Sequence, residues 1–200
     1  MLQCQNKKGR VMKAGFTILE LIFVIIILGI LAAIALPRLG ASKDEAEVSK
    51  ALSNLKTVIT DISTYSLKND SLSNTAAMSN VSGLENVDLS NFTGTKEVGF
   101  KVGNDERCIR LVFVNESNAL SFALATNDTT KTLIENLAKA QNQNSKNPND
   151  AGAKAAVQNA TNALLNADLT STSSNKACVS LSTSQSFRAL ANKNYVILGN

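Results

Sequence analysis

The chain has 200 residues, a formal net charge of +4 and no histidine. This length fits one globular domain with an anchoring segment, and the lack of histidine excludes Ser-His and Cys-His nucleophile pairs. The sequence also lacks a glycine-rich phosphate loop, and its acidic residues are dispersed. We therefore expect a protein that is not an enzyme and holds no cofactor or metal.

The excess positive charge lies at the start of the chain. Four basic residues and no acidic residue precede Phe16, whereas the rest of the chain has sixteen of each sign. This distribution gives no indication of a direct nucleic-acid site. Positive charge just before an apolar helix keeps that end of the helix in the cytoplasm, so we expect the bulk of the chain outside it.

Residues 16–36 follow as an apolar run with a single charged side chain, Glu20. About 20 such residues span a bilayer as a helix, and the run is about twice as long as the apolar part of a secretory signal. A carboxylate in this segment costs roughly 3 kcal/mol, and intramembrane acidic residues are usually functional. Two interpretations of Glu20 stay open: it pairs with a partner group, or it reaches the membrane surface from a simple anchor.

The sequence GFTILE at residues 15–20, followed by the apolar run, resembles the processing site of type IV pilins and of the related pseudopilins of type II secretion. Glycine before the cut, phenylalanine after it and glutamate at the fifth mature position make up the motif. Gly29 and Pro37 also fall where this family places a helix-softening glycine and proline. The resemblance extends over about residues 13–65 and fades beyond them.

The resemblance implies that prepilin peptidase cuts between Gly15 and Phe16, which makes residues 1–15 a leader peptide, and that the new Phe16 amine is methylated. A translation start at Met12 would give a shorter leader. In a helical filament, Glu20 would pair with the Phe16 amine of a neighbouring subunit. Both groups would otherwise be buried unpaired, so only a subunit in the correct axial register would neutralise them.

Residues 37–68 are expected to continue the helix as an amphipathic segment. Its apolar side chains recur at steps of three and four, at Val48, Leu52, Leu55, Ile59 and Ile62. Pro37 lacks an N–H and would clash with the preceding turn, which predicts a kink or local melting. The resemblance implies that the segment from Gly29 to Pro37 unwinds during assembly; an incidental transmembrane proline is the open alternative.

Residues 69–200 are expected to form a globular α+β head. A small antiparallel sheet would pack on the second half of the long helix, as the resemblance to pilins implies. The strand candidates are Val98–Val102, Cys108–Val114, Ala119–Ala125 and Tyr195–Leu198. In the second candidate, apolar residues alternate with Arg110 and Val112, which suits a sheet with one face on the long helix.

An insertion rich in Asn and Ala occupies about residues 139–175 of the head. Thr132 and Glu135 have the spacing that caps a short helix through Ala140. One apolar face of a second helix would consist of Ala153, Val157, Ala160 and Leu164. We favour two short helices, and a flexible surface excursion is the alternative that such a composition leaves open.

The cysteines fit an exported domain. Cys4 leaves with the leader, and the remaining Cys108 and Cys178 would face an oxidising compartment. We predict a disulfide between them, with two buried thiols as the alternative. The bond would close a loop of about 70 residues and stabilise the head by about 4 kcal/mol. Without histidine, the pair does not make a zinc site.

Two classes of function remain open. The first is a structural subunit of a homo-oligomeric filament. Within this class we favour a type IV pilin serving adhesion, twitching motility or DNA uptake, because of the predicted disulfide and the sizeable head. A major pseudopilin of a type II secretion system is the alternative in the same class. The second class is a non-assembling, membrane-anchored binding module.

Both filament interpretations imply the same partners and the same route. The partners would be other copies of the chain, prepilin peptidase, an inner-membrane assembly platform and the lipid bilayer before assembly. The subunit would begin as a single-pass inner-membrane protein with a cytoplasmic N-terminus. It would end in an extracellular pilus or in a periplasmic pseudopilus.

Overall fold

The computed structural model describes residues 17–116 and 119–199, except the side chains of residues 35–42 and 198–199. The chain separates into two compact units, Met1–Ser42 and Lys43–Asn200. The second unit is the head, and it contains the whole sheet.

Helix α1 (Ile18–Asn69) crosses the boundary between the two units, and Gly29 and Pro37 both lie inside it. In the head, α1 buries one stripe of side chains, made of Ala51, Leu55, Val58, Ile59 and Ile62. The helix ends where Asp70 adopts a left-handed conformation with a φ of 54°, and the Asp70 N–H donates to the Ser66 carbonyl at 2.8 Å. This arrangement satisfies a carbonyl of the last helical turn.

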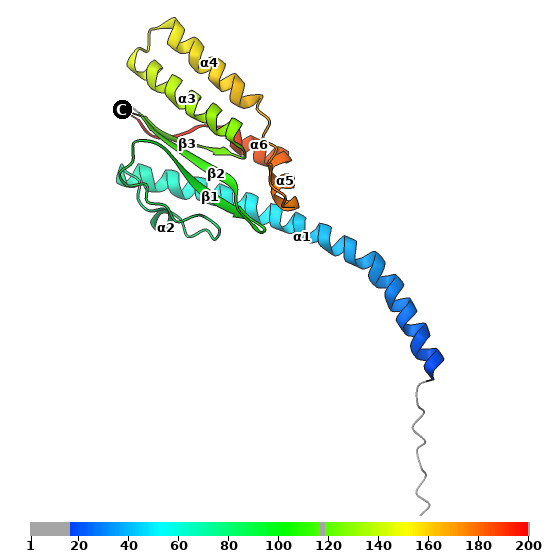
Figure 1. Ribbon diagram of the computed structural model, residues 1–200. Helices are drawn as coiled ribbons and strands as arrows, with labels where there is room; N and C mark the ends of the chain where they lie inside the picture. Colours follow the sequence, from blue (N-terminus) through cyan, green and yellow to red (C-terminus); the bar gives the residue numbers. More distant parts are fainter. Residues whose placement is uncertain (1–16, 117–118, 200) are drawn as a thin grey trace, which may run out of the picture. The chain divides into compact units, whose positions relative to one another are not determined.

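The head contains a four-stranded antiparallel sheet whose strands lie in sequence order (Figure 1). The strands are β1 (Gly94–Val102), β2 (Asp105–Glu116), β3 (Ala119–Ala125) and β4 (Tyr195–Gly199). The four predicted strands and the α+β fold class are confirmed, although β1 and β2 begin earlier than predicted. Val102 pairs with Asp105, so a tight turn joins β1 to β2, and Gly103 supplies the positive φ of 59° that such a turn requires.

One face of the sheet packs against the second half of α1. Phe113 and Phe122 are fully buried and stack with 5.1 Å between ring centroids, and Tyr195 stacks on Phe122 at 5.0 Å. Three short helices contribute to the same core: α2 (Thr75–Met78), α5 (Lys176–Thr183) and α6 (Gln185–Ala191). Their buried side chains include Met78, Leu181 and Phe187. The main core therefore lies between α1 and the sheet.

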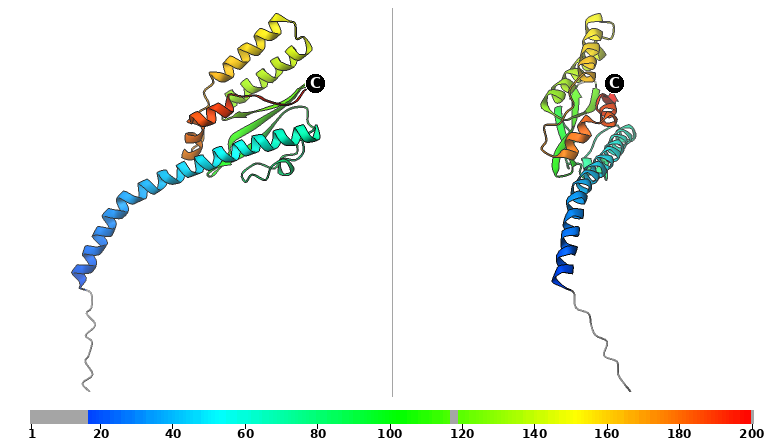
Figure 2. Two further views of the ribbon diagram at one scale, coloured as in Figure 1. Left: turned by 180° about the vertical axis from the view of Figure 1, so that it is seen from behind. Right: turned by 90° about the vertical axis from the view of Figure 1, so that its right-hand side faces the viewer.

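The opposite face of the sheet is covered by α3 (Asp128–Lys146) and α4 (Ala151–Leu165) (Figure 2). Val112 and Val114 are 0% and 1% exposed, and they share a second core with Ile134 and Leu164. The sequence-based expectation of a sheet with one face on the long helix is thus incomplete. A second layer of helices buries the other face, which makes the head three layers thick.

The helical interpretation of the region between β3 and β4 is confirmed, but the cap predicted at Thr132 is wrong. Helix α3 begins before Thr132, because the Asn127 Oδ1 accepts from the Thr130 N–H at 2.9 Å and forms a capping box. The Asn127 amide also donates to the carbonyls of Asp168 and Thr170, at 3.1 and 3.2 Å. One side chain therefore caps the helix and holds the later loop against it.

Candidate assembly site

The first unit presents the apolar half of α1. Every side chain from Thr17 to Ile34 is exposed, and those of Ile18 and Leu19 are 80% and 79% exposed. Continuous apolar surface of this extent marks a site of contact with a membrane or with other protein chains.

No helix among the described residues is both long enough and apolar enough to cross a membrane. Phe16 and Leu36, the two ends of the predicted transmembrane helix, lie outside the residues whose side chains are described. The assignment of residues 16–36 as a membrane span therefore stays a prediction.

Glu20 lies in the first turn of α1 and forms a capping box with Thr17. The Glu20 Oε2 accepts from the Thr17 N–H at 3.2 Å and from the Thr17 hydroxyl at 3.1 Å, and the Thr17 Oγ1 accepts from the Glu20 N–H at 3.2 Å. The carboxylate also lies at the positive end of the helix dipole. Two local features therefore fix the orientation of the one acidic group in the apolar half.

The capping box leaves part of the Glu20 carboxylate open to a further donor. Oε1 accepts no hydrogen bond from the described residues, and a carboxylate has about four acceptor positions. The capping box is a feature that the sequence analysis missed. Its signal was present, since Thr17-x-x-Glu20 directly precedes an apolar run.

The other residues of the predicted processing and assembly site are only partly described. Gly15 and Phe16, the predicted cleavage and methylation site, lie outside the described residues. Gly29 lies in α1, and a Cβ built on it would meet no atom within 4 Å. Contacts with the described residues of the subunit therefore do not require a glycine at this position. The helix-softening role predicted for Gly29 and Pro37 stays a prediction.

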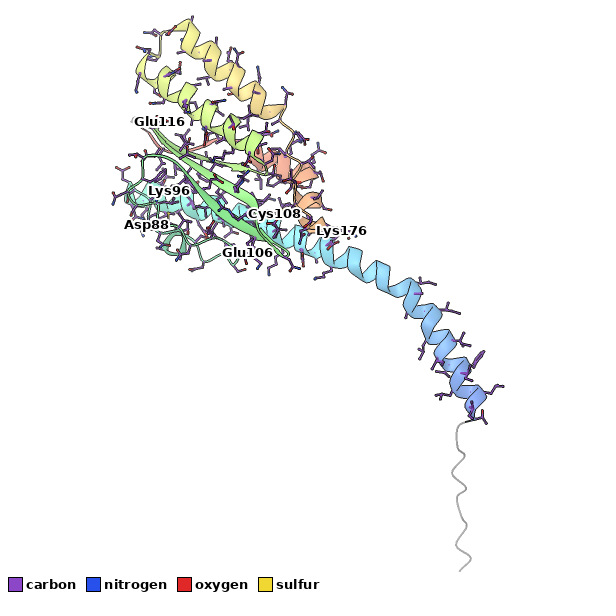
Figure 3. The ribbon with its side chains drawn as sticks, in the orientation of Figure 1. Asp88, Lys96, Glu106, Cys108, Glu116 and Lys176 are labelled. Atoms are coloured by element: carbon purple, nitrogen blue, oxygen red, sulfur yellow. A yellow bond between two sulfur atoms is a disulfide. The ribbon has the colours of Figure 1, made fainter. Side chains whose placement is uncertain are left out.

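The predicted disulfide between Cys108 and Cys178 is confirmed, with an S–S distance of 2.03 Å and 5.7 Å between the Cα atoms. It joins β2 to α5, and in Figure 3 Cys108 lies beside the start of α5, which Lys176 marks. Both residues are buried. In the part of the chain that the structure describes, no group of three or more His, Cys, Asp or Glu side chains could hold a metal ion.

An ion-pair network centred on Glu97 joins the sheet to α3. Lys131 Nζ lies 2.6 Å from Glu97 Oε1, and the guanidinium nitrogens of Arg110 and Arg107 lie 3.2 and 3.6 Å from Oε2. Arg110 also pairs with Asp128, at 2.8 Å. Burial opposes ionisation of the Glu97 carboxyl, but the Lys131 hydrogen bond and the three positive charges outweigh it, so the pKa of Glu97 is lowered from its ordinary value. The network therefore holds α3 on the sheet.

These features together give an α+β fold, and the arrangement is consistent with the fold that the resemblance to pilins implies. One helix carries an exposed apolar half with a single capped acidic side chain, and its other half packs on a four-stranded antiparallel sheet. The disulfide and the outer helical layer complete the head.

Comparison with curated proteins finds similarity to one named protein of type II secretion systems, over part of the chain. The chain is 40% identical over 58 residues to the type II secretion system core protein G of Aeromonas hydrophila, which is 29% of this chain and 41% of that protein. The proteins of the same name from Pseudomonas aeruginosa and Escherichia coli are 37% and 38% identical over 57 and 55 residues. These stretches are 28% of this chain and 40% and 38% of the two relatives.

The resemblance to the pilin and pseudopilin group is thereby confirmed over a partial stretch. The chain spans less than half of the length of these relatives. No family model and no solved structure matches the chain.

Proposed function

We propose that the protein is a major pseudopilin, the structural subunit of a periplasmic filament in a type II secretion system. The observation that supports this most is the similarity to core protein G of type II secretion in several bacteria. It favours the alternative of the sequence analysis over the surface pilus that we favoured there. That preference depended on the disulfide and on the size of the head, and neither feature is tied to one kind of filament.

Assembly would use the exposed apolar half of α1. Outside the bilayer, burying one Ile or Leu side chain contributes about 1.5–3 kcal/mol, so packing these helices into a central bundle supplies most of the attraction. This attraction is not directional and fixes no register. Pairing of Glu20 with the Phe16 amine of a neighbour would fix it, because each buried charge needs its partner.

The capping box prepares Glu20 for this role. Thr17 holds Oε2 through two hydrogen bonds, and Oε1 accepts none from the described residues, so the carboxylate can receive an ammonium group without breaking the helix cap. A group that is already oriented loses less conformational entropy on binding than a mobile one. The account thus assigns Thr17 to positioning and Glu20 to pairing.

The route to the filament would begin at the inner membrane. The basic residues before Phe16 would keep the N-terminus in the cytoplasm, where prepilin peptidase would cut after Gly15 and the Phe16 amine would be methylated. An assembly platform would then move subunits from the bilayer into the filament. The head would lie in the periplasm, where the Cys108–Cys178 bond is stable.

A deletion in the native host tests the proposal against the surface pilus. Loss of exoprotein secretion with normal surface piliation and twitching supports the pseudopilin. Loss of piliation or twitching with normal secretion contradicts it and favours the type IV pilin. Complementation with the wild-type chain is the control, and a chain with Gly15→Leu, which blocks the peptidase site, should fail to complement.

A further inference from the structure

The charged side chains of the head are divided unequally along the chain. Residues 70–106, the acidic segment, contain six acidic and two basic side chains, a net charge of −4. Residues 136–199, the basic segment, contain six basic and two acidic side chains, a net charge of +4. The side-chain charges after residue 15 sum to zero, but the chain contains two regions whose net charges are equal and opposite.

The loop of the acidic segment and the helical hairpin of the basic segment lie on opposite sides of the head. The acidic segment includes α2, the loop that follows it and β1, and the basic segment includes most of α3 together with α4, α5, α6 and β4. The loop of the acidic segment lies along β1, where Leu84 pairs with Phe100, whereas α3 and α4 of the basic segment cover a face of the sheet. The turn between β1 and β2 is the exception, because the Cys108–Cys178 bond holds the adjoining part of β2 against α5. Figures 1 and 2 show α2 with its loop on one side of the sheet and the hairpin of α3 and α4 on the other.

Many of these charges are open to solvent. Lys139, Lys146 and Lys154 are exposed, and they form no ion pair with the described residues. Asp88 is likewise exposed and outside the ion pairs of the described chain, in contrast to Glu97, which the network with α3 satisfies. Glu106 is exposed as well, and it pairs with Lys101 of its own segment at 3.1 Å. These exposed side chains are thus available to a partner.

The acidic segment is also held in a fixed shape. Its loop bonds to β1 through the Glu85 N–H to the Gly99 carbonyl and the Lys101 N–H to the Gly83 carbonyl, both at 2.8 Å. The Gly99 N–H donates to the Glu85 carboxylate at 2.7 Å. These bonds cover part of the edge of β1, so contacts on this side are made by side chains rather than by an added strand.

We propose that the acidic segment of one head docks on the basic segment of the next copy in the filament. An open helical filament needs a heterologous contact, in which two different surfaces of the same chain meet. Two oppositely charged surfaces on opposite sides of one head provide such a contact, and a single two-fold contact would not pair both at once. The proposal depends on the proposed function and adds a specific head contact to it.

Charge complementarity at this contact would act on order more than on affinity. Complementary potentials orient approaching partners and make wrong, like-charged arrangements costly. Interactions between exposed charges reach about 8 Å at physiological salt, so they act only between adjacent heads. The apolar helices would hold the filament together, and the heads would fix the rotation between successive subunits.

Carbodiimide cross-linking of wild-type filaments tests the proposal directly. Filaments built from a mixture of isotopically light and heavy subunits distinguish bonds between copies from bonds within one copy. Cross-links between carboxylates of residues 70–106 and lysines of residues 136–199 of different copies are expected. Intermolecular cross-links confined to other parts of the chain would overturn the proposal.

Charge reversal provides the second test. The variants Lys139→Glu/Lys146→Glu/Lys154→Glu and Asp88→Lys/Glu106→Lys are each expected to lower filament yield about tenfold or more, because like charges then face each other. Combining both sets should restore most of the yield. The matched neutral variants Lys139→Gln/Lys146→Gln/Lys154→Gln and Asp88→Asn/Glu106→Gln should give intermediate yields.

The controls separate this proposal from the proposed function. Yield is compared at equal levels of cleaved, membrane-inserted subunit, and formation of the Cys108–Cys178 bond checks that each head is folded. If the wild-type chain forms filaments and either reversal leaves the yield unchanged, the head contact is wrong while the pseudopilin function stands. Loss of yield that the combined variant does not restore would indicate that the charged partner is not a second copy. Loss that follows only reversal of the lysines would indicate an acidic partner other than a second copy.

Discussion

Breaking the disulfide is expected to lower the free energy of unfolding of the head by about 4 kcal/mol. The bond joins Cys108 and Cys178 across a sequence separation of 70 residues. In the chain-entropy model, a closed loop of this length lowers the entropy of the unfolded chain by about 15 cal/mol/K, which gives about 4 kcal/mol at 25 °C. Single domains are stable by only roughly 5–15 kcal/mol, so the reduced head would be marginally stable.

The assay compares three forms of the full-length protein in detergent: oxidised wild type, wild type reduced by dithiothreitol, and Cys108→Ala/Cys178→Ala. Both cysteines are buried, so the alanine variant also loses packing contacts and should be the least stable. The reduced form isolates the bond itself. Urea unfolding is followed by the fluorescence of Tyr65 and Tyr195, both of which lie in the head.

The result that would refute this reasoning is a small effect in the reduced form. A loss below about 1 kcal/mol, at a similar dependence on urea, would mean that other contacts already restrict the unfolded chain. The single variant Cys178→Ala is the control, because it removes the bond but keeps the Cys108 side chain. It should lie close to the reduced wild type.

Three further predictions concern the ion-pair network and α1. The network lowers the pKa of Glu97, so the stabilisation by the ionised carboxylate is present above the ordinary pKa of 4.5 and is lost as the pH falls below that value. The difference in unfolding free energy between wild type and Glu97→Gln should therefore shrink from about pH 7 to about pH 3. A difference that does not change with pH would contradict this. Thr17→Val removes the hydroxyl of the capping box, so it should weaken the helix start by about 1 kcal/mol and lower filament yield. Thr17→Ser keeps the hydroxyl and should behave as wild type. Equal yields from the two variants would exclude a positioning role for Thr17. In Gly29→Ala the added Cβ meets no described atom within 4 Å, so insertion and processing should stay intact. Alanine favours the helix by about 1 kcal/mol over glycine, so the variant should impair assembly if this position must unwind. Unchanged filament yield would remove the softening role.

Much of the inner half of the head could be predicted from the sequence. Apolar runs between turn residues predicted the strands. The buried stripe of α1 that includes Leu55 and Ile62 follows the helical period, so it was also predicted. The pairing of Cys108 with Cys178 was predicted because the expected removal of the leader leaves only these two cysteines, and the structure confirms the bond. These features depend on local patterns and on simple counting.

The outer layer was harder to predict because its contacts are long-range. Val112 was interpreted as part of an alternating pattern, but the run from Cys108 to Val114 is almost continuously apolar, which is typical of a strand buried on both faces. The start of α3 depends on Asn127, whose amide also binds carbonyls about forty residues later. Such a tertiary contact leaves no signal in the local sequence.

The candidate site was predicted in part. Glu20 was found because it is the one charge in an apolar run, and the sequence also held the Thr17-x-x-Glu20 signal that was not used. The proposed partner of the carboxylate, the Phe16 amine, belongs to a neighbouring subunit. The pairing is a property of the filament and needs a measurement on the assembled form.

The central claim is that the charge of Glu20 drives ordered assembly, and Glu20→Gln tests it most directly. Glutamine keeps a side-chain oxygen for the Thr17 cap, so the helix start and insertion should be preserved while the negative charge is lost. The measurement is filament yield in sheared and membrane fractions, at matched levels of cleaved, membrane-inserted subunit, with Glu20→Ala beside it. The account predicts that both variants are inserted and cleaved but assemble poorly, because the Phe16 amine of the neighbour is left buried without a partner. Normal filament yield from Glu20→Gln would contradict it.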